Sequence, residues 1–327
     1  MLRQTFLAAA ICCVFAACAR AAEEGAFTDP AKAGPDFAVQ GEYKGELKRD
    51  DQGIDIGCQV IALGDGKFRG VFCIGGLPGD GWKRGDTQLA VDSQNENGSV
   101  IFTGDNGSAK IVEGKMIVSD PGGNTIGTMA KVDRKSPTLG ANPPPGAKVL
   151  FDGTNANQWV DGKIVEKNLL LAGTRSKDDF QDFSLHLEFR TPFVPKARGQ
   201  GRGNSGLYLQ NRYECQVLDS FGLEGANNEC GGFYQIREPD VNMCYPPLAW
   251  QTYDVDFTAA RFEGEKKIKN ARVTVKQNGV TIHDDFELPT LTPGGAPAEF
   301  PGKGPFQLQA HGNPVTYRNI WVVEKKS

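Results

Sequence analysis

Polar and apolar side chains alternate along residues 203–220, a stretch that reads as two short strands joined by a tight turn. Side chains point to opposite faces of a strand with a period of two. One face would therefore carry hydrogen-bonding and charged groups, namely Tyr208, Gln210, Glu214 and Gln216. The other face would meet the core through Leu207, Leu209, Cys215 and Val217. A polar row of this kind suits a polyhydroxylated ligand such as a sugar.

Two further segments show the same alternation. Residues 184–190 place three polar side chains opposite apolar ones: His186, Glu188 and Arg190. Residues 306–311 do the same with Gln307, Gln309 and His311. We expect these strands to share one face with the first pair and to form a single polar site. The competing interpretation is a solvated sheet surface, in which Glu188 and Arg190 form a structural ion pair and His311 is a turn residue.

Four other residues have both a functional and a structural interpretation. Asn204 would contact a ligand or cap a turn, and Trp250 would stack on a sugar ring or fill the core. Asp219 has the opposite strand phase and is expected to form a turn. The histidine at position 283 follows the hairpin turn Asn278-Gly279 and is expected to be exposed.

The first 21 residues predict a secretory signal peptide. Arg3 supplies a positive charge, an apolar run follows from Thr5 to Ala17, and Ala19-Arg20-Ala21 fits a cleavage site. The alternative is lipoprotein processing at Cys18. The sequence thus predicts a periplasmic or secreted protein, and no other segment is long and apolar enough for an integral membrane span.

Composition limits the class of partner. The chain has 327 residues and a formal net charge of −4. It has no basic patch interleaved with aromatic residues, so we expect no nucleic acid partner. Glycine-rich turns separate short alternating runs, and long helical periodicity is absent, which predicts an all-β protein.

The chain divides into two expected domains. Residues 22–36 form a spacer, residues 37–133 a small all-β domain, and residues 134–148 a proline-rich linker. Residues 149–327 form a second domain with regularly spaced strands, which suggests a jelly-roll β-sandwich.

Five cysteines remain after the leader, and an oxidising compartment would favour disulfides. Cys58 and Cys73 lie on neighbouring expected strands and are predicted to pair. Cys230 and Cys244 bracket one loop and form a second possible pair, whereas Cys215 is expected to be a buried free thiol. A zinc site is disfavoured because the spacing contains no C-x-x-C unit and no nearby histidine.

An ordered set of short motifs runs through the second domain: Leu150-Phe151-Asp152-Gly153, Asn204-Ser205-Gly206, Tyr213-Glu214-Cys215-Gln216-Val217-Leu218-Asp219, Glu229-Cys230-Gly231, Trp250-Gln251-Thr252-Tyr253-Asp254 and His311-Gly312-Asn313-Pro314. In this order they closely resemble the 3-keto-disaccharide hydrolase family over residues 149–327. The resemblance implies a concanavalin A-like lectin/glucanase fold and action on glycosides oxidised at C3 of the sugar. One departure is Ala310, where relatives tend to carry an acidic residue.

The implied chemistry is removal of the C2 proton, elimination at C1 and hydration, which needs a base, an electrophile near the ketone and an acid. We assign Glu214 or His311 as the base and Glu188 as the acid or a metal ligand. The expected substrate-binding residues are Arg190, Asn204, Tyr208, Gln210, Gln216, Trp250 and Gln309. A divalent metal ion would help to stabilise the enediolate, but no spacing requires one.

Three other functions remain open from the sequence. The same fold can serve as a non-catalytic carbohydrate-binding module. An ordinary endo-glycanase would carry a Glu-x-Asp-x-x-Glu strand, which the sequence lacks. If the polar row is solvated surface, the domain is a structural module.

Overall fold

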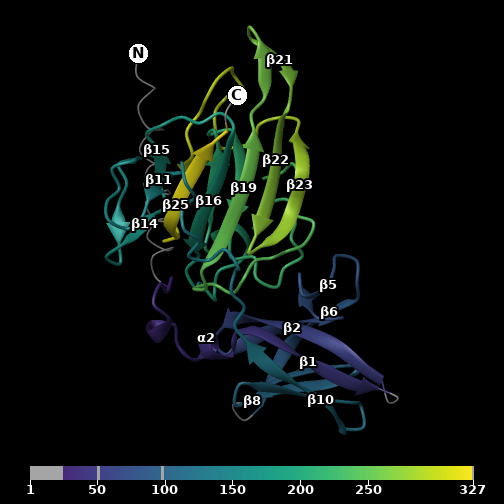
Figure 1. Ribbon diagram of the computed structural model, residues 1–327. Coiled ribbons are helices and arrows are strands. Elements are labelled where there is room, and N and C mark those ends of the chain that lie inside the picture. The colour runs from purple at the N-terminus through teal and green to yellow at the C-terminus, as the bar shows by residue number, and fades with distance from the viewer. Residues whose placement is uncertain (1–24, 50–51, 97–98, 326–327) are drawn as a thin grey trace, which may run out of the picture.

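The computed structural model describes residues 25–49, 52–96 and 99–325. Their regular structure is almost entirely β-strand, arranged as a closed barrel followed by a two-sheet sandwich (Figure 1). The all-β class and the jelly-roll sandwich expected from the sequence are confirmed. The signal peptide and the lipidation site predicted from the sequence lie outside the described residues and stay predictions.

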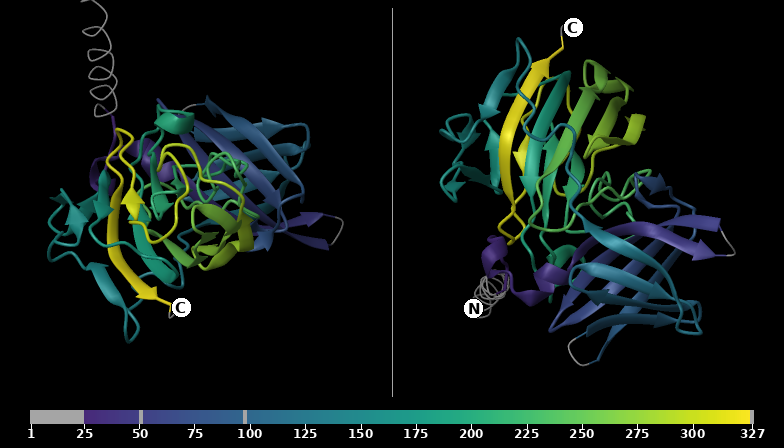
Figure 2. Two further views of the ribbon diagram at one scale, coloured as in Figure 1. Left: turned by 90° about the horizontal axis from the view of Figure 1, so that it is seen from above. Right: turned by 60° about the horizontal axis from the view of Figure 1, so that its bottom comes forward.

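The first body is an eight-stranded antiparallel barrel with the strand order β1-β10-β9-β8-β7-β6-β3-β2 (Figure 2). Its strands are β1 (Gly41–Arg49), β2 (Gln52–Gly64), β3 (Lys67–Ile74), β6 (Gln88–Glu96), β7 (Ser99–Gly104), β8 (Gly107–Val112), β9 (Lys115–Ser119) and β10 (Thr125–Val132). Alternate side chains point inward and fill one half of the barrel, among them Tyr43, Val60, Phe68, Met116 and Met129. The short strands β4 (Leu77–Pro78) and β5 (Gly81–Trp82) pair beside it.

The sandwich has a larger and a smaller sheet. The larger runs in the order β13 (Ile164–Val165), β14 (Leu169–Leu171), β25 (Thr316–Glu324), β16 (Phe183–Arg190), β19 (Gln251–Thr258), β22 (Ala271–Gln277) and β23 (Val280–Leu288), with β11 (Lys148–Phe151) also paired to β25. The smaller runs β12 (Trp159–Val160), β15 (Thr174–Ser176), β24 (Gln307–Leu308), β17 (Ser205–Leu209) and β18 (Tyr213–Val217). The hairpin of β20 (Arg261–Glu263) and β21 (Lys266–Lys269) projects at the top of Figure 1.

The two sheets bury one shared core between them. Leu187 and Phe189 of β16 belong to the same buried cluster as Leu207 and Cys215 of the smaller sheet. Because side chains alternate, the polar residues of β16 and those of β17 and β18 point out of opposite sides of the sandwich. The single polar face predicted for all these strands is therefore wrong: alternation gives the phase of each strand but not the sheet that it joins.

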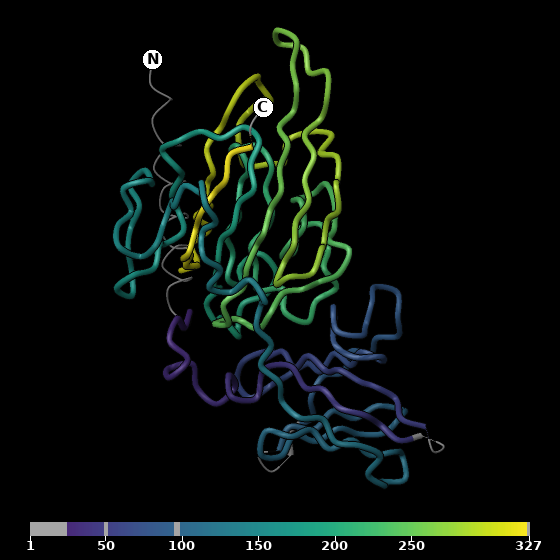
Figure 3. Tube along the Cα trace, in the orientation of Figure 1, coloured from purple at the N-terminus to yellow at the C-terminus, as the bar shows by residue number. Residues whose placement is uncertain are grey.

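The segments expected as spacer and linker both contact the sandwich. Phe27 pairs with Phe193 just before the 3-10 turn η1 (Pro30–Lys32) and the short helix α2 (Pro35–Val39). Residues 133–147 cross from the barrel over the outer face of the larger sheet (Figure 3). There the Ser136 hydroxyl lies 2.7 Å from that of Thr252, and the Thr138 hydroxyl donates to Asp254 at 2.7 Å.

The five described cysteines are all buried and free. Cys58 packs inside the barrel, whereas Cys73 packs against the sandwich core. The two residues are one register step apart, since Cys58 faces Phe72 and Cys73 faces Gly57, so their side chains leave opposite faces. The predicted Cys58–Cys73 disulfide is therefore wrong, and Cys230 and Cys244, the second possible pair, are also free. The buried free thiol expected at Cys215 is confirmed.

The helical segments of the described residues are α2 and the 3-10 turns η1 and η2 (Gly199–Gly201). None of them is long and apolar enough to cross a bilayer.

Candidate functional site

The candidate site lies on the outer face of the smaller sheet. Tyr208 faces Glu214 and Gly206 faces Gln216 across the antiparallel pair β17–β18. These side chains point away from the core, as the alternation of the sequence predicts. The tight turn between the strands keeps the register and so fixes the tyrosine next to the carboxyl group.

Glu214 is a buried carboxyl group with only one of its oxygens bonded. Its side chain is almost fully covered, at 2% exposure. The Tyr208 hydroxyl donates to Oε2 at 2.7 Å, and Oε1 is buried without a hydrogen-bond partner among the described residues. Burial raises the pKa of Glu214 to about 7, against the tyrosine hydrogen bond, which lowers it. The group is thus near half-ionisation at neutral pH.

Gly206 makes room for this carboxyl group. A Cβ atom at position 206 would lie 2.0 Å from Oε1 of Glu214. The Glu214 side chain therefore lies across the backbone of the neighbouring strand, and only glycine permits so close an approach.

An amide network continues from the carboxyl along the same face. Gln216 donates through Nε2 to Oε1 of Gln200 at 3.1 Å, and Asn204 donates through Nδ2 to the same oxygen at 3.0 Å. Oδ1 of Asn204 is a second buried oxygen without a partner among the described residues. Gln309 donates through Nε2 to the Tyr208 hydroxyl at 3.3 Å. The structure thus brings together Glu214, Tyr208, Gln216, Asn204 and Gln309.

The segment that carries His311 is fixed beside this network on both sides. The amide of Gln309 donates to the carbonyl of Gly206 at 2.9 Å, and Oδ1 of Asn313 accepts from the amide of Asn204 at 2.9 Å. His311 lies between these two anchors and is exposed. The chain at His311 is therefore fixed next to the site, and its side chain is open to solvent.

The loop between β23 and β24 covers the tyrosine and the carboxyl. Thr292 accepts from the amide of Glu214 at 2.8 Å, and the carbonyl oxygen of Pro293 lies 2.9 Å from the Tyr208 hydroxyl oxygen. Gly294 follows at a point where a Cβ atom would lie 2.6 Å from that hydroxyl. This roof excludes water and explains the raised pKa of the carboxyl.

Glu188 is not part of this site, which corrects the grouping made from the sequence. It lies on the outer face of the larger sheet, where Arg318 donates to Oε2 at 2.6 Å and the amide of Gly140 donates to Oε1 at 2.5 Å. Burial alone would raise its pKa, but hydrogen bonds from His186, Asn319, Gly140 and Arg318 outweigh burial and lower it to about 2. This carboxylate holds the interdomain segment on the sheet.

Arg190 and Trp250 also lie on the larger sheet's side. Arg190 forms an ion pair with Glu166 at 2.6 Å, and its guanidinium lies 5.1 Å from the centre of the Trp250 ring. Arg318 packs on the same ring at 4.0 Å. These expected substrate-binding residues are therefore separated from Glu214 by the thickness of the sandwich.

Gln210 and His283 hold the framework. Gln210 is in the turn between β17 and β18 with φ of 54°, and its Nε2 donates to the carbonyl of Phe180 at 2.8 Å. His283 is fully buried and donates to the carbonyl of Gly231 at 2.7 Å, so the exposure predicted for it is wrong. Burial lowers the pKa of His283 to about 4. The bulged pairing of β22 with β23 turns this side chain into the core.

Two polar residues of the face were missed from the sequence. Arg175 faces Gln307, which in turn faces Tyr208, so all three lie in one row across the smaller sheet. Arg175 is exposed. It lies on a three-residue strand, which is too short to show periodicity. Gln200 lies in η2, and only its place four residues before Asn204 could have suggested it.

The residues of this face do not fit a divalent metal ion. The described residues contain no cluster of three or more histidine, cysteine, aspartate or glutamate side chains that could hold one. Glu214 supplies one carboxylate, surrounded by neutral amides and a phenol. Calcium and magnesium sites in proteins use six or more oxygen ligands, usually with several carboxylates or waters.

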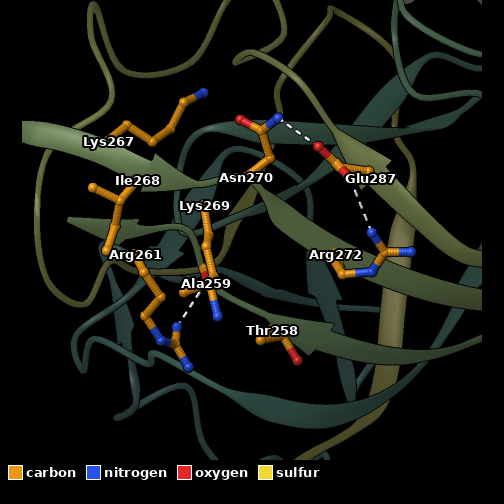
Figure 4. A pocket seen from close by; sticks show the side chains of 9 residues that line it. All are labelled: Thr258, Ala259, Arg261, Lys267, Ile268, Lys269, Asn270, Arg272 and Glu287. Carbon is orange, nitrogen blue, oxygen red and sulfur yellow. Dashed lines mark hydrogen bonds and ion pairs between the residues drawn. The ribbon is translucent and has the colours of Figure 1, made fainter.

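A separate surface hollow of about 660 Å³ lies beside the β20–β21 hairpin (Figure 4). Within it, Arg272 and Asn270 both donate to Glu287, and Arg261 donates to the carbonyl of Ala259. It holds none of the expected site residues.

Comparison with known proteins identifies the family of the sandwich domain. The model of the 3-keto-alpha-glucoside-1,2-lyase-like domain matches residues 146–323. A candidate glycosyl hydrolase of Parabacteroides distasonis, solved at 2.13 Å, is 31% identical with a TM-score of 0.52, and the match covers 56% of this chain and 85% of that one. A second from the same organism, solved at 1.70 Å, is 17% identical with a TM-score of 0.42, over 55% of this chain and 94% of that one. A search of curated proteins found no match. With more than half of its length matched, the chain belongs to the family of 3-keto-alpha-glucoside-1,2-lyase-like domains.

Proposed function

We propose that the sandwich is a carbohydrate-active enzyme that cleaves glycosides bearing a ketone at C3 of the sugar. Membership of the family supports a glycosyl hydrolase type of activity. The observation that carries the finer proposal is Glu214: a buried carboxyl group with a raised pKa and one unbonded oxygen, set on a polar sheet face.

Glu214 is the base in this proposal. A ketone at C3 acidifies the hydrogen on C2, and Oε1 of Glu214 takes that proton while the electron pair moves to the ketone oxygen. A carboxyl group with a pKa of about 7 is a stronger base than an ordinary glutamate. The Tyr208 hydroxyl holds Oε2, so that the free oxygen keeps a fixed direction.

His311 is the acid. When the enolate collapses, the C1–O bond breaks, and the departing oxygen takes a proton from the imidazole. Water then adds across the C1–C2 double bond, with hydroxyl to C1 and hydrogen to C2, so the net reaction is hydrolysis. Asn204, Gln216 and Gln309 would bind the sugar hydroxyls, and Arg175 would contact a more distant part of the substrate, three strands from Glu214.

This arrangement differs from that of an ordinary glycosidase. Such enzymes place two carboxyl groups on either side of the scissile bond, about 5 to 9.5 Å apart. Of the two glutamates considered from the sequence, Glu214 lies on this face, and Glu188 lies on the opposite side of the sandwich. One carboxyl group and a neighbouring imidazole suit elimination next to a ketone.

The test is turnover of a chromogenic 3-keto-glucoside by the protein of residues 22–327, with the unoxidised glucoside as a second substrate. We expect release of the aglycone from the keto substrate only, and incorporation of deuterium at C2 in D₂O. Glu214→Gln should lose both, whereas Glu188→Gln, a matched change on the opposite face, should keep turnover per folded molecule. Binding of the sugar with neither reaction would indicate a carbohydrate-binding module and overturn the proposal.

We also propose that the protein is exported and that residues 1–21 are removed. The basis is the pattern of residues 3–21. N-terminal sequencing of the protein recovered from cells should give Ala22, and a lipidated Cys18 would contradict it.

A further inference from the structure

The barrel contains a cavity at the end opposite its packed half. The cavity has a volume of about 470 Å³, and every one of the eight barrel strands contributes to its lining. The side chains around it include Leu47, Ile56, Phe72, Leu89, Phe102 and Val118. A volume of this size is within the range of roughly 300–1,000 Å³ that is usual for small-molecule sites.

The lining is apolar and uncharged. No aspartate, glutamate, lysine or arginine lines the cavity, and its polar residues are neutral ones such as Thr87, Gln88 and Ser119. An ionised ligand would lose its hydration there without a counter-charge, which is strongly unfavourable. The chemistry of the walls therefore selects an uncharged, mainly apolar molecule.

Residue size explains why this half of the barrel is hollow. Large inward side chains such as Tyr43, Phe68 and Met116 fill the other half. Around the cavity the chain places the small residue Ala109, and a side chain at Gly104 would meet open space. An eight-stranded barrel is just wide enough to be filled by side chains or to hold one small ligand, so small residues in one half leave space for a ligand.

The mouth of the cavity is apolar as well. Ile74 and Leu89, on the neighbouring strands β3 and β6, are 39% and 46% exposed although both are large hydrophobic residues that line the cavity. Apolar side chains grouped at an opening and continuous with an apolar interior are typical of a ligand entrance.

We propose that the barrel binds one uncharged, apolar small molecule, which enters past Ile74 and Leu89 and packs against the contacting rings of Phe72 and Phe102. Binding uses dispersion and burial of apolar surface, with no ionic contact. The site is separate from the face of Glu214, and it stands whether or not the sandwich cleaves keto-glycosides.

The experiment is a fluorescence titration of the protein of residues 22–327 with N-phenyl-1-naphthylamine, an uncharged probe that becomes bright in apolar surroundings. We expect saturation at one probe per protein. Leu89→Glu, which places a charge at the mouth, should weaken binding at least tenfold. Ile268→Glu is the matched control, because Ile268 is equally exposed, at 46%, but lies on the hairpin of the sandwich.

A second variant separates blocking of the cavity from a change at its mouth. Ala109→Phe would fill the space from inside and should also abolish saturable binding, with circular dichroism showing an intact barrel. Absence of saturable binding by the unchanged protein would overturn the proposal. Equal probe binding by Leu89→Glu and Ile268→Glu would overturn it as well. A dimer of the unchanged protein that Leu89→Glu dissociates would also overturn it, because a second copy of the chain would then cover the mouth of the cavity.

Discussion

Replacing Glu214 by glutamine should make the protein more stable at alkaline pH while it removes the proposed base. The folded protein holds the pKa of this carboxyl group at about 7, and the reference value is 4.5. Because the pKa is raised, the folded state binds the proton more tightly than the unfolded state, and stability is lost as pH rises from about 4.5 through about 7. Glutamine cannot ionise and so escapes this loss.

The size of the effect follows from the shift. A difference of about 2.5 pKa units at roughly 1.36 kcal/mol per unit amounts to about 3 kcal/mol. The side chain is 2% exposed, so solvent screening reduces this little. The free energy of unfolding of Glu214→Gln, relative to that of the unchanged protein, should therefore be about 3 kcal/mol higher at pH 8.5 than below pH 4.5.

Urea unfolding at pH 4.5, 6.5 and 8.5 measures this difference, and Glu188→Gln provides a control of opposite sign. The pKa of Glu188 is lowered to about 2, so this carboxylate contributes stability that is present above about pH 4.5 and lost as pH falls towards 2. Glu188→Gln should destabilise by about 3 kcal/mol at both pH 6.5 and pH 8.5. If the difference in unfolding free energy between Glu214→Gln and the unchanged protein stays constant from pH 4.5 to 8.5, the raised pKa of the buried Glu214 carboxyl group is refuted.

Tyr208→Phe removes the hydrogen bond that lowers the pKa of Glu214. The acid limb of the profile of kcat/KM against pH should therefore move up by about one to two pH units. An unmoved limb would show that another group is the base. Gly206→Ala should lower kcat by about a hundredfold or more by displacing that carboxyl, whereas Gly104→Ala, with open space at its Cβ, should have no effect on kcat. Asp219→Asn should destabilise the folded protein by about 3–5 kcal/mol, because Arg202 then stays buried without the charged partner that lies 2.7 Å away. Thermal unfolding measures this loss. A loss under about 1 kcal/mol, the size typical of an exposed ion pair, would contradict the prediction.

Local features of the fold were predictable from the sequence. The Asn278-Gly279 dipeptide predicts a two-residue hairpin, and β22 and β23 meet there. Alternation on β17 and β18 gives the inward and outward residues correctly, because the period of two is a property of the strand itself. Asp219, expected to form a turn, accepts from the amide of Phe221 at 3.4 Å. It also makes a buried ion pair with Arg202, whose Nη1 donates to the carbonyl of Ala62 in the barrel.

Features that depend on distant partners were not predictable. His186 shows the difficulty, because its alternation is as regular as that of Glu214, yet its strand joins the other sheet. There it is buried, with its Nδ1 2.6 Å from Oδ1 of Asp254. The predicted disulfide fails for a related reason, since neighbouring strands bring cysteines together only when their register places both on one face.

The contrast between Glu188 and Glu214 carries the assignment of the base. Both are glutamates in the outward phase of a strand, and both are buried, so neither local sequence nor burial distinguishes them. Glu188 receives hydrogen bonds from groups that include Arg318 and Asn319, some 130 positions away, and these stabilise its ionised form until it is too weak a base to remove a proton from carbon. Glu214 meets one neutral donor, and burial then leaves it basic and near half-ionisation at neutral pH. The proposed base is therefore the carboxyl group that the fold leaves without a cationic partner among the described residues, and the sheet that its strand joins decides which group that is.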